Sequence, residues 1–480
     1  MPTPRRGAIP SDASPDTVPE LGRLLKNVGS LAGAQSLVKL LYFLLLAIVA
    51  RLLPEAGFGR ISYALLYAGF FAFLYDFGIA TIVVRDLSGV PHGRLNTVFS
   101  RALGTRLMQT AVAVLVMSVS GAILGFQGRE LSVLVLLCIG VVLTNLAEFM
   151  HLPFTAHDRI DRSAALLAAE RLIVVVCSIT ALVVGRTELA FATGYVGGSV
   201  GAVVLAALVL SRDIGWIRIR PPARLLWQEA LPIGLNMFFA MFYNRAGVLL
   251  VEYLYGAEAV AQYNSAFLFL FLLQVSAGAL MISLFPSMSR LNQVSVPRLR
   301  RLYSRISLGI LLVVVPVIAL GAILARPLLI VGFGREYAAA DGILKILFWT
   351  AGLFVFNTLA GHVFRATGRQ RIMAWITFFG ASLSVILYLM MVEALYLTGV
   401  ALALLITEGI ITLVCTATLV REFGGFSNPA YHAGLLLTAL LTGWVTLTGR
   451  VILLLPLGCV YAVAWLAALI VLRRRNEERT

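Results

Sequence analysis

The stretch from Asn27 to Arg85 reads NVGSLAGAQSLVKLLYFLLLAIVARLLPEAGFGRISYALLYAGFFAFLYDFGIATIVVR. It consists of two apolar runs joined by a short segment rich in proline and glycine, 53–59. Each run is long enough to cross the ~30 Å hydrocarbon core of a bilayer, which takes about 20 helical residues. The stretch therefore predicts a helical hairpin in a membrane, with Lys39 in the middle of its first helix.

The composition of the whole chain agrees with this interpretation. Of its 480 residues, 60% are hydrophobic and 13% are charged, and the mean hydropathy is +0.93. The apolar runs are continuous rather than alternating, which favours an all-α integral membrane protein over a membrane barrel. The net charge of +15 comes from basic residues spread over many short loops. This distribution is typical of loops beside anionic membrane lipids, and it does not indicate a nucleic acid partner.

Hydropathy predicts about fourteen transmembrane helices, and no connecting loop is long enough to form a soluble domain. If the N-terminus is cytoplasmic, the inside segments hold 28 Lys and Arg residues, Arg106 and Arg171 among them, and the outside loops hold 8. Because cytoplasmic loops are enriched in Lys and Arg, both termini are expected in the cytoplasm. The predicted spans are 28–53, 61–84, 101–125, 131–152, 163–185, 189–210, 228–252, 259–285, 303–325, 339–364, 370–391, 395–420, 431–448 and 450–472.

Two hinge segments indicate an internal repeat. Residues 53–60 align with 255–262, and 62–64 align with 264–266, so the first two spans resemble the seventh and eighth. Because an even number of spans separates the copies, the repeat is parallel, with an axis along the membrane normal. We therefore expect two pseudo-symmetric six-helix lobes around a central cavity, plus two extra C-terminal helices. The predicted organisation is a disordered cytoplasmic tail (1–22), an N-lobe (23–211), a cytoplasmic linker (212–227), a C-lobe (228–424), the last two spans (425–473) and a second cytoplasmic tail (474–480).

Two basic residues, Lys39 and Arg245, lie in the middle of predicted spans. Lys39 is 12 residues from Asn27, roughly 18 Å at 1.5 Å per residue, which is too far for its side chain to reach the interface. A charge at the bilayer centre costs at least ~2.5–3.5 kcal/mol, so it normally faces a watery cavity or a partner. Our hypothesis is that both residues line the central cavity and bind a phosphate group. The alternative is a structural ion pair with Glu148 or Glu408.

Polar neighbours of these two cations complete the predicted substrate-binding set. Gln35 lies one helical turn before Lys39 and on the same face. Asn236 and Asn244 share the predicted span of Arg245. Their amides are suited to hydrogen bonds with a polar headgroup.

Two alternative roles are open for the acidic residues Glu148 and Glu408 within the spans. Glu148 and Glu408 are candidates for coupling transport to a proton or another cation, and each could instead pair with a nearby base. Asp76 lies near the cytoplasmic end of its span, and we interpret it as a packing or capping residue next to Arg85.

Signatures of enzymes and metal sites are missing from the sequence. The four cysteines lie in apolar runs without CxxC spacing, which favours small buried side chains; they are Cys138, Cys177, Cys415 and Cys459. The chain has no GxSxG elbow, no P-loop and no HExxH motif. We therefore expect a protein that is not an enzyme and that uses neither a cofactor nor a metal.

Several short motifs occur in a recognisable order. They are Asn27, Ala50–Pro54, Gly57–Gly59, Asp76–Gly78 and Arg85 in the first half, and Leu231–Gly234, Tyr243–Arg245, Leu284–Pro286 and Phe333–Tyr337 in the second. Over about residues 22–425 this order resembles the Wzx-type polysaccharide and O-antigen flippases. The resemblance implies the multidrug/oligosaccharidyl-lipid/polysaccharide exporter superfamily, which also holds peptidoglycan-precursor flippases and drug antiporters. Family members often carry an aspartate directly after the arginine of the seventh span, whereas Ala246 stands there in this chain.

The resemblance also implies a function and a set of partners. The implied substrate is an undecaprenyl-pyrophosphate-linked oligosaccharide, a precursor of polysaccharide or lipopolysaccharide. It would be turned across the bacterial cytoplasmic membrane by alternating access of two lobes, with membrane lipids and a polysaccharide polymerase or glycosyltransferase machinery as further partners. Two alternatives stay open. A drug antiporter of the same architecture would need an acidic site for cationic drugs, and a membrane polymerase or ligase would need a large periplasmic loop.

Overall fold

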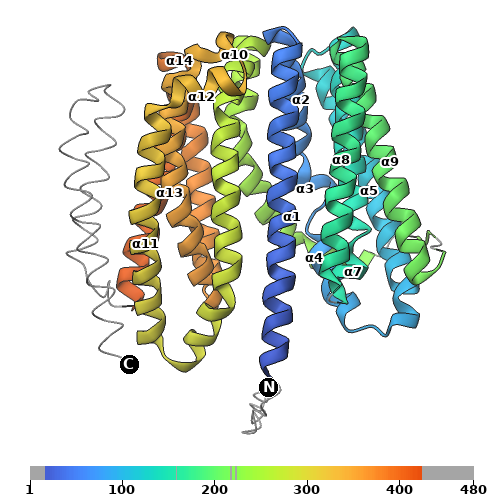
Figure 1. The fold of residues 1–480 in the computed structure, drawn as a ribbon, viewed down its shortest axis with the longest axis vertical. Coiled ribbons are helices and arrows are strands. Elements are labelled where there is room, and N and C mark those ends of the chain that lie inside the picture. Colours follow the sequence, from blue (N-terminus) through green and yellow to red (C-terminus); the bar gives the residue numbers. More distant parts are fainter. Residues whose placement is uncertain (1–16, 158, 217–218, 222–223, 424–480) are drawn as a thin grey trace.

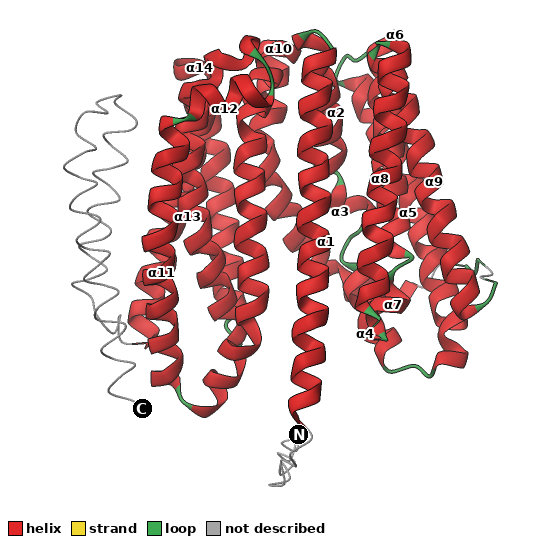
Figure 2. Cartoon of the chain, in the orientation of Figure 1, coloured by secondary structure: helices red, strands yellow, loops and turns green. Residues whose placement is uncertain are grey.

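The computed structural model describes residues 17–423, except 158, 217–218 and 222–223, and in helical segments such as 17–32, 235–237 and 241–245 it describes the backbone alone. Every regular element in this part is a helix (Figure 2). The prediction of an all-α membrane protein is confirmed. The elements are α1 (Thr17–Leu52), α2 (Glu55–Phe70), α3 (Ala72–Tyr75), α4 (Ile79–Ser88), η1 (His92–Arg94), α5 (Leu95–Ile123), α6 (Gly128–Phe149), α7 (Leu152–Ala156), α8 (Ile160–Gly185), α9 (Glu188–Ile214), α10 (Arg224–Val294), α11 (Val296–Ile323), α12 (Ala325–Gly332), η2 (Arg335–Ala340), α13 (Asp341–Ala366) and α14 (Gln370–Phe423).

Each of the first twelve predicted spans falls on a helix of the described part. The second span is broken, because the segment 72–88 is bent by 45° from α2. α10 and α14 each contain two helices that meet at a kink, at Gly256 (φ 77°) and Tyr396 (φ 55°). The predicted spans 431–448 and 450–472 and the two predicted tails, apart from the start of α1 at Thr17, lie outside the described residues.

The helices form two groups (Figure 1). The elements from α1 to α9 form the first group and those from α10 to α14 form the second, with α1 and α10 packed against each other where the groups meet. Large apolar side chains cover the outer faces, and Leu115, Val184 and Leu413 are 63%, 82% and 70% exposed. In a membrane protein such side chains face lipid tails, which are as apolar as they are.

The two groups meet at the end of the bundle that carries both hinges of the repeat. A Cβ atom on Gly59 of α2 would lie 1.8 Å from the backbone oxygen of Ala257 in α10, so only glycine fits at this crossing. Arg51, at the end of α1, donates a hydrogen bond to the backbone oxygen of Gly332 on α12 at 3.3 Å. The charge pattern of the loops predicts that this end is the outer one.

Candidate functional site

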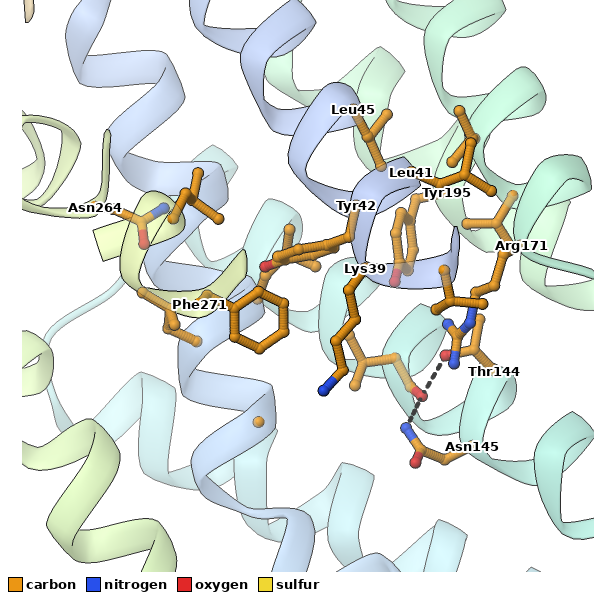
Figure 3. A pocket seen from close by; sticks show the side chains of 18 of the residues that line it. Lys39, Leu41, Tyr42, Leu45, Thr144, Asn145, Arg171, Tyr195, Asn264 and Phe271 are labelled. Carbon is orange, nitrogen blue, oxygen red and sulfur yellow. Dashed lines mark hydrogen bonds between the residues drawn. The ribbon is translucent and has the colours of Figure 1, made fainter. Parts of the chain in front are cut away.

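Two adjoining cavities lie among the helices of the first group. Cavity A, of about 380 Å³, is lined by α1, α2, α6, α8 and α9, and α10 closes it on one side (Figure 3). Cavity B, of about 460 Å³, is lined by α1, the break in the second span, α5, α6, α7 and α8. Both volumes fall in the range of roughly 300–1,000 Å³ that is usual for small-molecule sites. The cavities share four lining residues, Val38, Lys39, Asn145 and Glu148.

Lys39 lies in the shared wall. Its ammonium nitrogen is 5.0 Å from the ring centroid of Phe271 on α10, which is a cation–π distance. In Figure 3 its side chain extends from α1 into the space between Phe271 and Asn145. Gln35, one turn earlier on α1, lines cavity B. The structure thus brings these two predicted residues to one site, while their roles in binding stay predictions.

The predicted partners of Lys39 on the seventh span are described by their backbone alone. Residues 236, 244 and 245 belong to α10. The side chains of Asn236, Asn244 and Arg245 lie outside the described part of the chain. A chamber shared by Lys39 and Arg245 therefore remains a prediction.

Glu148 is paired with an arginine that the sequence analysis did not select. Its Oε1 accepts a hydrogen bond from Nη2 of Arg171 on α8, so the paired alternative left open for Glu148 is the one observed. Arg171 lines cavity A and is the twelfth residue of α8, which puts it roughly 16 Å from the start of the helix. Its assignment to a cytoplasmic segment is therefore wrong, because Arg171 lies well inside a helix, beside an acidic partner, and not in a loop at the membrane surface.

Arg106 is the second arginine that was assigned to the cytoplasm and is buried instead, with 3% exposure. It is the twelfth residue of α5. Its Nη1 donates to the backbone oxygen of Tyr75 and, at 3.2 Å, to Oδ1 of Asp76. Its guanidinium carbon is 5.2 Å from the ring centroid of Phe149. The sequence analysis interpreted Asp76 as a packing or capping residue next to Arg85, and the structure shows a hydrogen bond from Arg106 to its carboxylate.

This pair stabilises the break in the second span. α3 ends at Tyr75, and the backbone passes through positive φ at Phe77 (48°) and Gly78 (76°) before α4 begins. A broken helix leaves carbonyl groups without intrahelical partners, and within the membrane other protein groups must satisfy them. Arg106 does so for the carbonyl of Tyr75. Discontinuous spans of this kind commonly form the binding sites of transporters.

The charges of the two cavities are unequal. Among the described side chains that line them, Lys39, Arg106 and Arg171 are cationic, and Asp76 and Glu148 are acidic. Both acids lie against arginines. The arrangement therefore presents an excess of positive charge and suits an anionic group better than a cationic one. No group of three His, Cys, Asp or Glu side chains suited to a metal ion occurs in the described part.

Two protein-family models match the chain. The family described as polysaccharide biosynthesis protein matches residues 24–292, which is more than half of the chain. The chain belongs to this family. The MatE family matches residues 232–391, within the second group of helices. The resemblance drawn from the motifs is thereby confirmed at the level of the superfamily of multidrug, oligosaccharidyl-lipid and polysaccharide exporters, whose members are transporters and flippases.

Solved structures share the fold of this polysaccharide biosynthesis protein. The lipid II flippase MurJ in an inward closed conformation has a TM-score of 0.67 and 11% identity, over 93% of this chain and 99% of its own. An inward-facing multidrug resistance MATE family transporter has a TM-score of 0.63 and 17% identity, over 80% and 94%. A transporter of the superfamily from Pyrococcus furiosus, described as having a binding pocket of reverse polarity, has a TM-score of 0.57 and 17% identity, over 83% and 96%. No curated protein sequence matches the chain.

A further buried pair in this family member lies beside cavity B. Nε2 of His151 is 2.7 Å from Oε1 of Glu170 on α8, and both side chains are at most 5% exposed. His151 lines the cavity. Sequence reasoning missed this pair, although both residues stand within predicted apolar spans, and that position was the available signal.

Glu408 is the predicted site residue that lies elsewhere. It is buried with 3% exposure in α14 and accepts a hydrogen bond from Nδ2 of Asn357 on α13. Thr412 donates to Oδ1 of the same asparagine at 2.9 Å. Neither α13 nor α14 contributes a described residue to the lining of cavity A or B. The structure therefore does not bring Glu408 to the site of Lys39.

Proposed function

We propose that the protein is a flippase that moves an oligosaccharide linked to undecaprenyl pyrophosphate from the inner to the outer leaflet of the bacterial cytoplasmic membrane. The observation that carries this proposal is the excess of cations, Lys39, Arg106 and Arg171, around the two adjoining cavities. A pyrophosphate is the anionic part of such a lipid. Its charge compensates cations whose placement in the membrane is otherwise costly.

Each cation has a distinct role in this proposal. Arg171 and Arg106 present planar guanidinium groups, which recognise phosphate oxygens in a bidentate way, and each lines one of the two cavities. Lys39 is a point charge on a flexible stem in the wall common to both cavities. Because Lys39 lies where the two cavities adjoin, we assign the first contact with the pyrophosphate to it.

The remaining predicted residues keep their proposed roles. Gln35 extends the polar wall of cavity B, and Arg245, with Asn236 and Asn244, would bind the headgroup from α10. For ion coupling, Glu148 and Glu408 remain the proposed sites. The contact of Glu148 with Arg171 supports a role in which it loses or gains its partner during transport.

The wider architecture supports alternating access. The two groups of helices touch at the predicted outer end, where Gly59 lies against Ala257. Neither Gly59 nor Ala257 lines a described cavity, and the part of α2 that lines cavity A begins at Leu65. We propose that both termini are cytoplasmic and that the delivered lipid is consumed by polymerase or glycosyltransferase machinery. Two proteins of similar fold, a lipid II flippase and a transporter described as having a pocket of reverse polarity, support an anionic cargo.

A drug antiporter is the second candidate, because the MatE family matches residues 232–391. Such a protein would hold cationic drugs on acidic side chains. In the described cavity walls, Asp76 and Glu148 both lie against arginines. This geometry favours a lipid-linked saccharide over a cationic drug as the substrate. Transport of either substrate does not require enzymatic activity.

The test is deletion in the host, followed by extraction of lipid-linked sugars. The proposal expects one lipid-linked oligosaccharide to accumulate in the cytoplasmic leaflet, and the wild-type gene to relieve this accumulation. Lys39→Ala should restore less than a tenth of the wild-type flux. Lys345→Ala is the matched control, because Lys345 forms a 2.8 Å ion pair with Asp341 in α13 and lines neither cavity. Unchanged lipid-linked sugars in the deletion strain would contradict the proposal.

A further inference from the structure

The wall that α10 contributes to cavity A differs in chemistry from the wall of the first group of helices. The described residues of α10 bring an amide, two phenyl rings and one leucine, and none of them is charged; they are Asn264, Phe267, Leu268 and Phe271. The facing helices bring Lys39, Glu148 and Arg171. Ligand sites combine apolar surface with a few polar groups that fix orientation, so two unlike walls suit two unlike parts of one ligand.

Asn264 is the polar group of the α10 wall. It is 1% exposed, and its Nδ2 has no hydrogen-bond partner within the described residues. A buried amide that donates no hydrogen bond costs free energy, and proteins rarely keep one without a reason. Ser62 is its equivalent in the repeat, and the hydroxyl of Ser62 is also buried and lacks a described partner. The two side chains therefore do not satisfy each other, and the amide of Asn264 is left for a ligand in the cavity that it lines.

Aromatic rings continue this wall toward Lys39. Phe271 is seven residues after Asn264 in the same helix, so both project from one face, two turns apart. The ring of Phe271 packs edge to face with that of Tyr42 on α1, with centroids 6.0 Å apart. Lys39 lies 5.0 Å from the same Phe271 ring. Figure 3 shows the amide, the aromatic pair and the ammonium group following one another along the cavity.

We propose that the α10 wall is a saccharide subsite that reads the sugar joined directly to the pyrophosphate. This sugar presents oxygen acceptors around its rim and an apolar face of C–H groups. Asn264 donates a hydrogen bond to one of the oxygens, and the apolar face packs on Phe271 and Tyr42. Lys39 then meets the adjacent phosphate. The inference rests on the proposed function, and it assigns selectivity for the first sugar to α10 and attraction of the anion to the facing helices.

The test compares two lipids that differ only in the sugar. Purified full-length protein in lipid nanodiscs is titrated with undecaprenyl pyrophosphate, and separately with the lipid-linked oligosaccharide extracted from the deletion strain. Binding is measured by native mass spectrometry. For Asn264→Leu, which keeps the branching of the side chain and removes the donor, we expect about tenfold weaker binding of the sugar-bearing lipid, the size of one lost hydrogen bond to a ligand. Binding of the sugar-free lipid should change less than twofold.

Two further variants keep this test independent of folding. Ser62→Ala removes a buried hydroxyl without a described partner at the equivalent position of the repeat, which does not line either cavity, and it should leave both affinities unchanged. Phe271→Leu should weaken the binding of the sugar-bearing lipid more than that of the sugar-free lipid, because the aromatic face is lost. Asn264→Leu should melt no lower than the wild type in the absence of lipid, since it removes an unsatisfied donor.

Three results are decisive against these assignments. If Asn264→Leu weakens the binding of both lipids equally, Asn264 only shapes the cavity. If it leaves the binding of both lipids unchanged, the amide of Asn264 does not contact a ligand. Either result overturns the saccharide subsite while leaving the flippase proposal in place. A wild-type protein that binds neither lipid would overturn the proposed function itself.

Discussion

The two groups of helices bury polar side chains in contrasting ways. In the first group, buried or half-buried ions line the cavities, and Arg106 and Arg171 are held there by Asp76 and Glu148. In the second group, the described acid Glu408 is enclosed in a network with Asn357 and Thr412 that meets neither cavity. Only a charge that faces a cavity can exchange its protein partner for a ligand. A buried acid in a membrane span is therefore not by itself a sign of transport chemistry.

Removal of Arg106 is expected to have the largest effect. Arg106→Leu leaves Asp76 without its partner and the carbonyl of Tyr75 unsatisfied at the break in the second span. Removing one member of a buried pair typically costs about 3–5 kcal/mol, so we expect a large loss of stability in detergent. Thermal unfolding of the purified protein measures it. The double variant Arg106→Leu with Asp76→Asn should regain part of the loss, and a double variant as unstable as the single one would show that the pair is not the cause.

A second test removes a positive and, separately, a negative charge from the wall of cavity A. Arg171→Gln removes a cation from the wall, and we expect undecaprenyl pyrophosphate to bind about tenfold more weakly, since charge-assisted hydrogen bonds contribute about 1.4 kcal/mol or more. Glu148→Gln releases Arg171 from its acidic partner and should strengthen the same binding a few-fold. Titration in nanodiscs measures both. If both variants weaken binding to the same extent, the pair holds the helices together and does not take part in binding.

The smallest effect is expected in the second group. Glu408→Gln keeps the shape of the side chain and can still accept the hydrogen bond from Asn357. It should change the affinity for undecaprenyl pyrophosphate less than twofold. The free energy of unfolding should change by less than about 1 kcal/mol, the size of a typical neutral hydrogen bond. A loss of transport with unchanged lipid binding would support the proposed ion coupling at Glu408, and unchanged transport would contradict it. A loss of lipid affinity as large as that expected for Arg171→Gln would remove the contrast between the two groups.

The sequence predicted the helices more completely than the site. Continuous apolar runs mark spans without reference to the rest of the fold, and each of the first twelve fell on a helix. Lys39 was found for the same reason, since it stands far from both ends of its run. Arg106 and Arg171 were missed because each lies near the start of a predicted span, where an arginine ordinarily belongs to the loop. Their partners are 30 and 23 residues away in the chain, and only tertiary packing shows them.

The break in the second span was also invisible to hydropathy. Its residues are as apolar as those of a straight helix, and Gly78 is the one local sign of the left-handed turn. Asn264 had a sequence signal of another kind, because the repeat aligned it with Ser62. The alignment did not indicate a binding role, and the structure then showed that Nδ2 of Asn264 and the hydroxyl of Ser62 are both buried without a described partner.

The contact of Gly59 with Ala257 has a consequence for how the two halves can rock. The backbone oxygen of Ala257 lies against the Cα of Gly59, which leaves no space for a side chain at this position. Under the proposed alternating access, the two halves would have to separate at this contact and close again in the same register. A methyl group at position 59 would then keep this end of the bundle from closing fully.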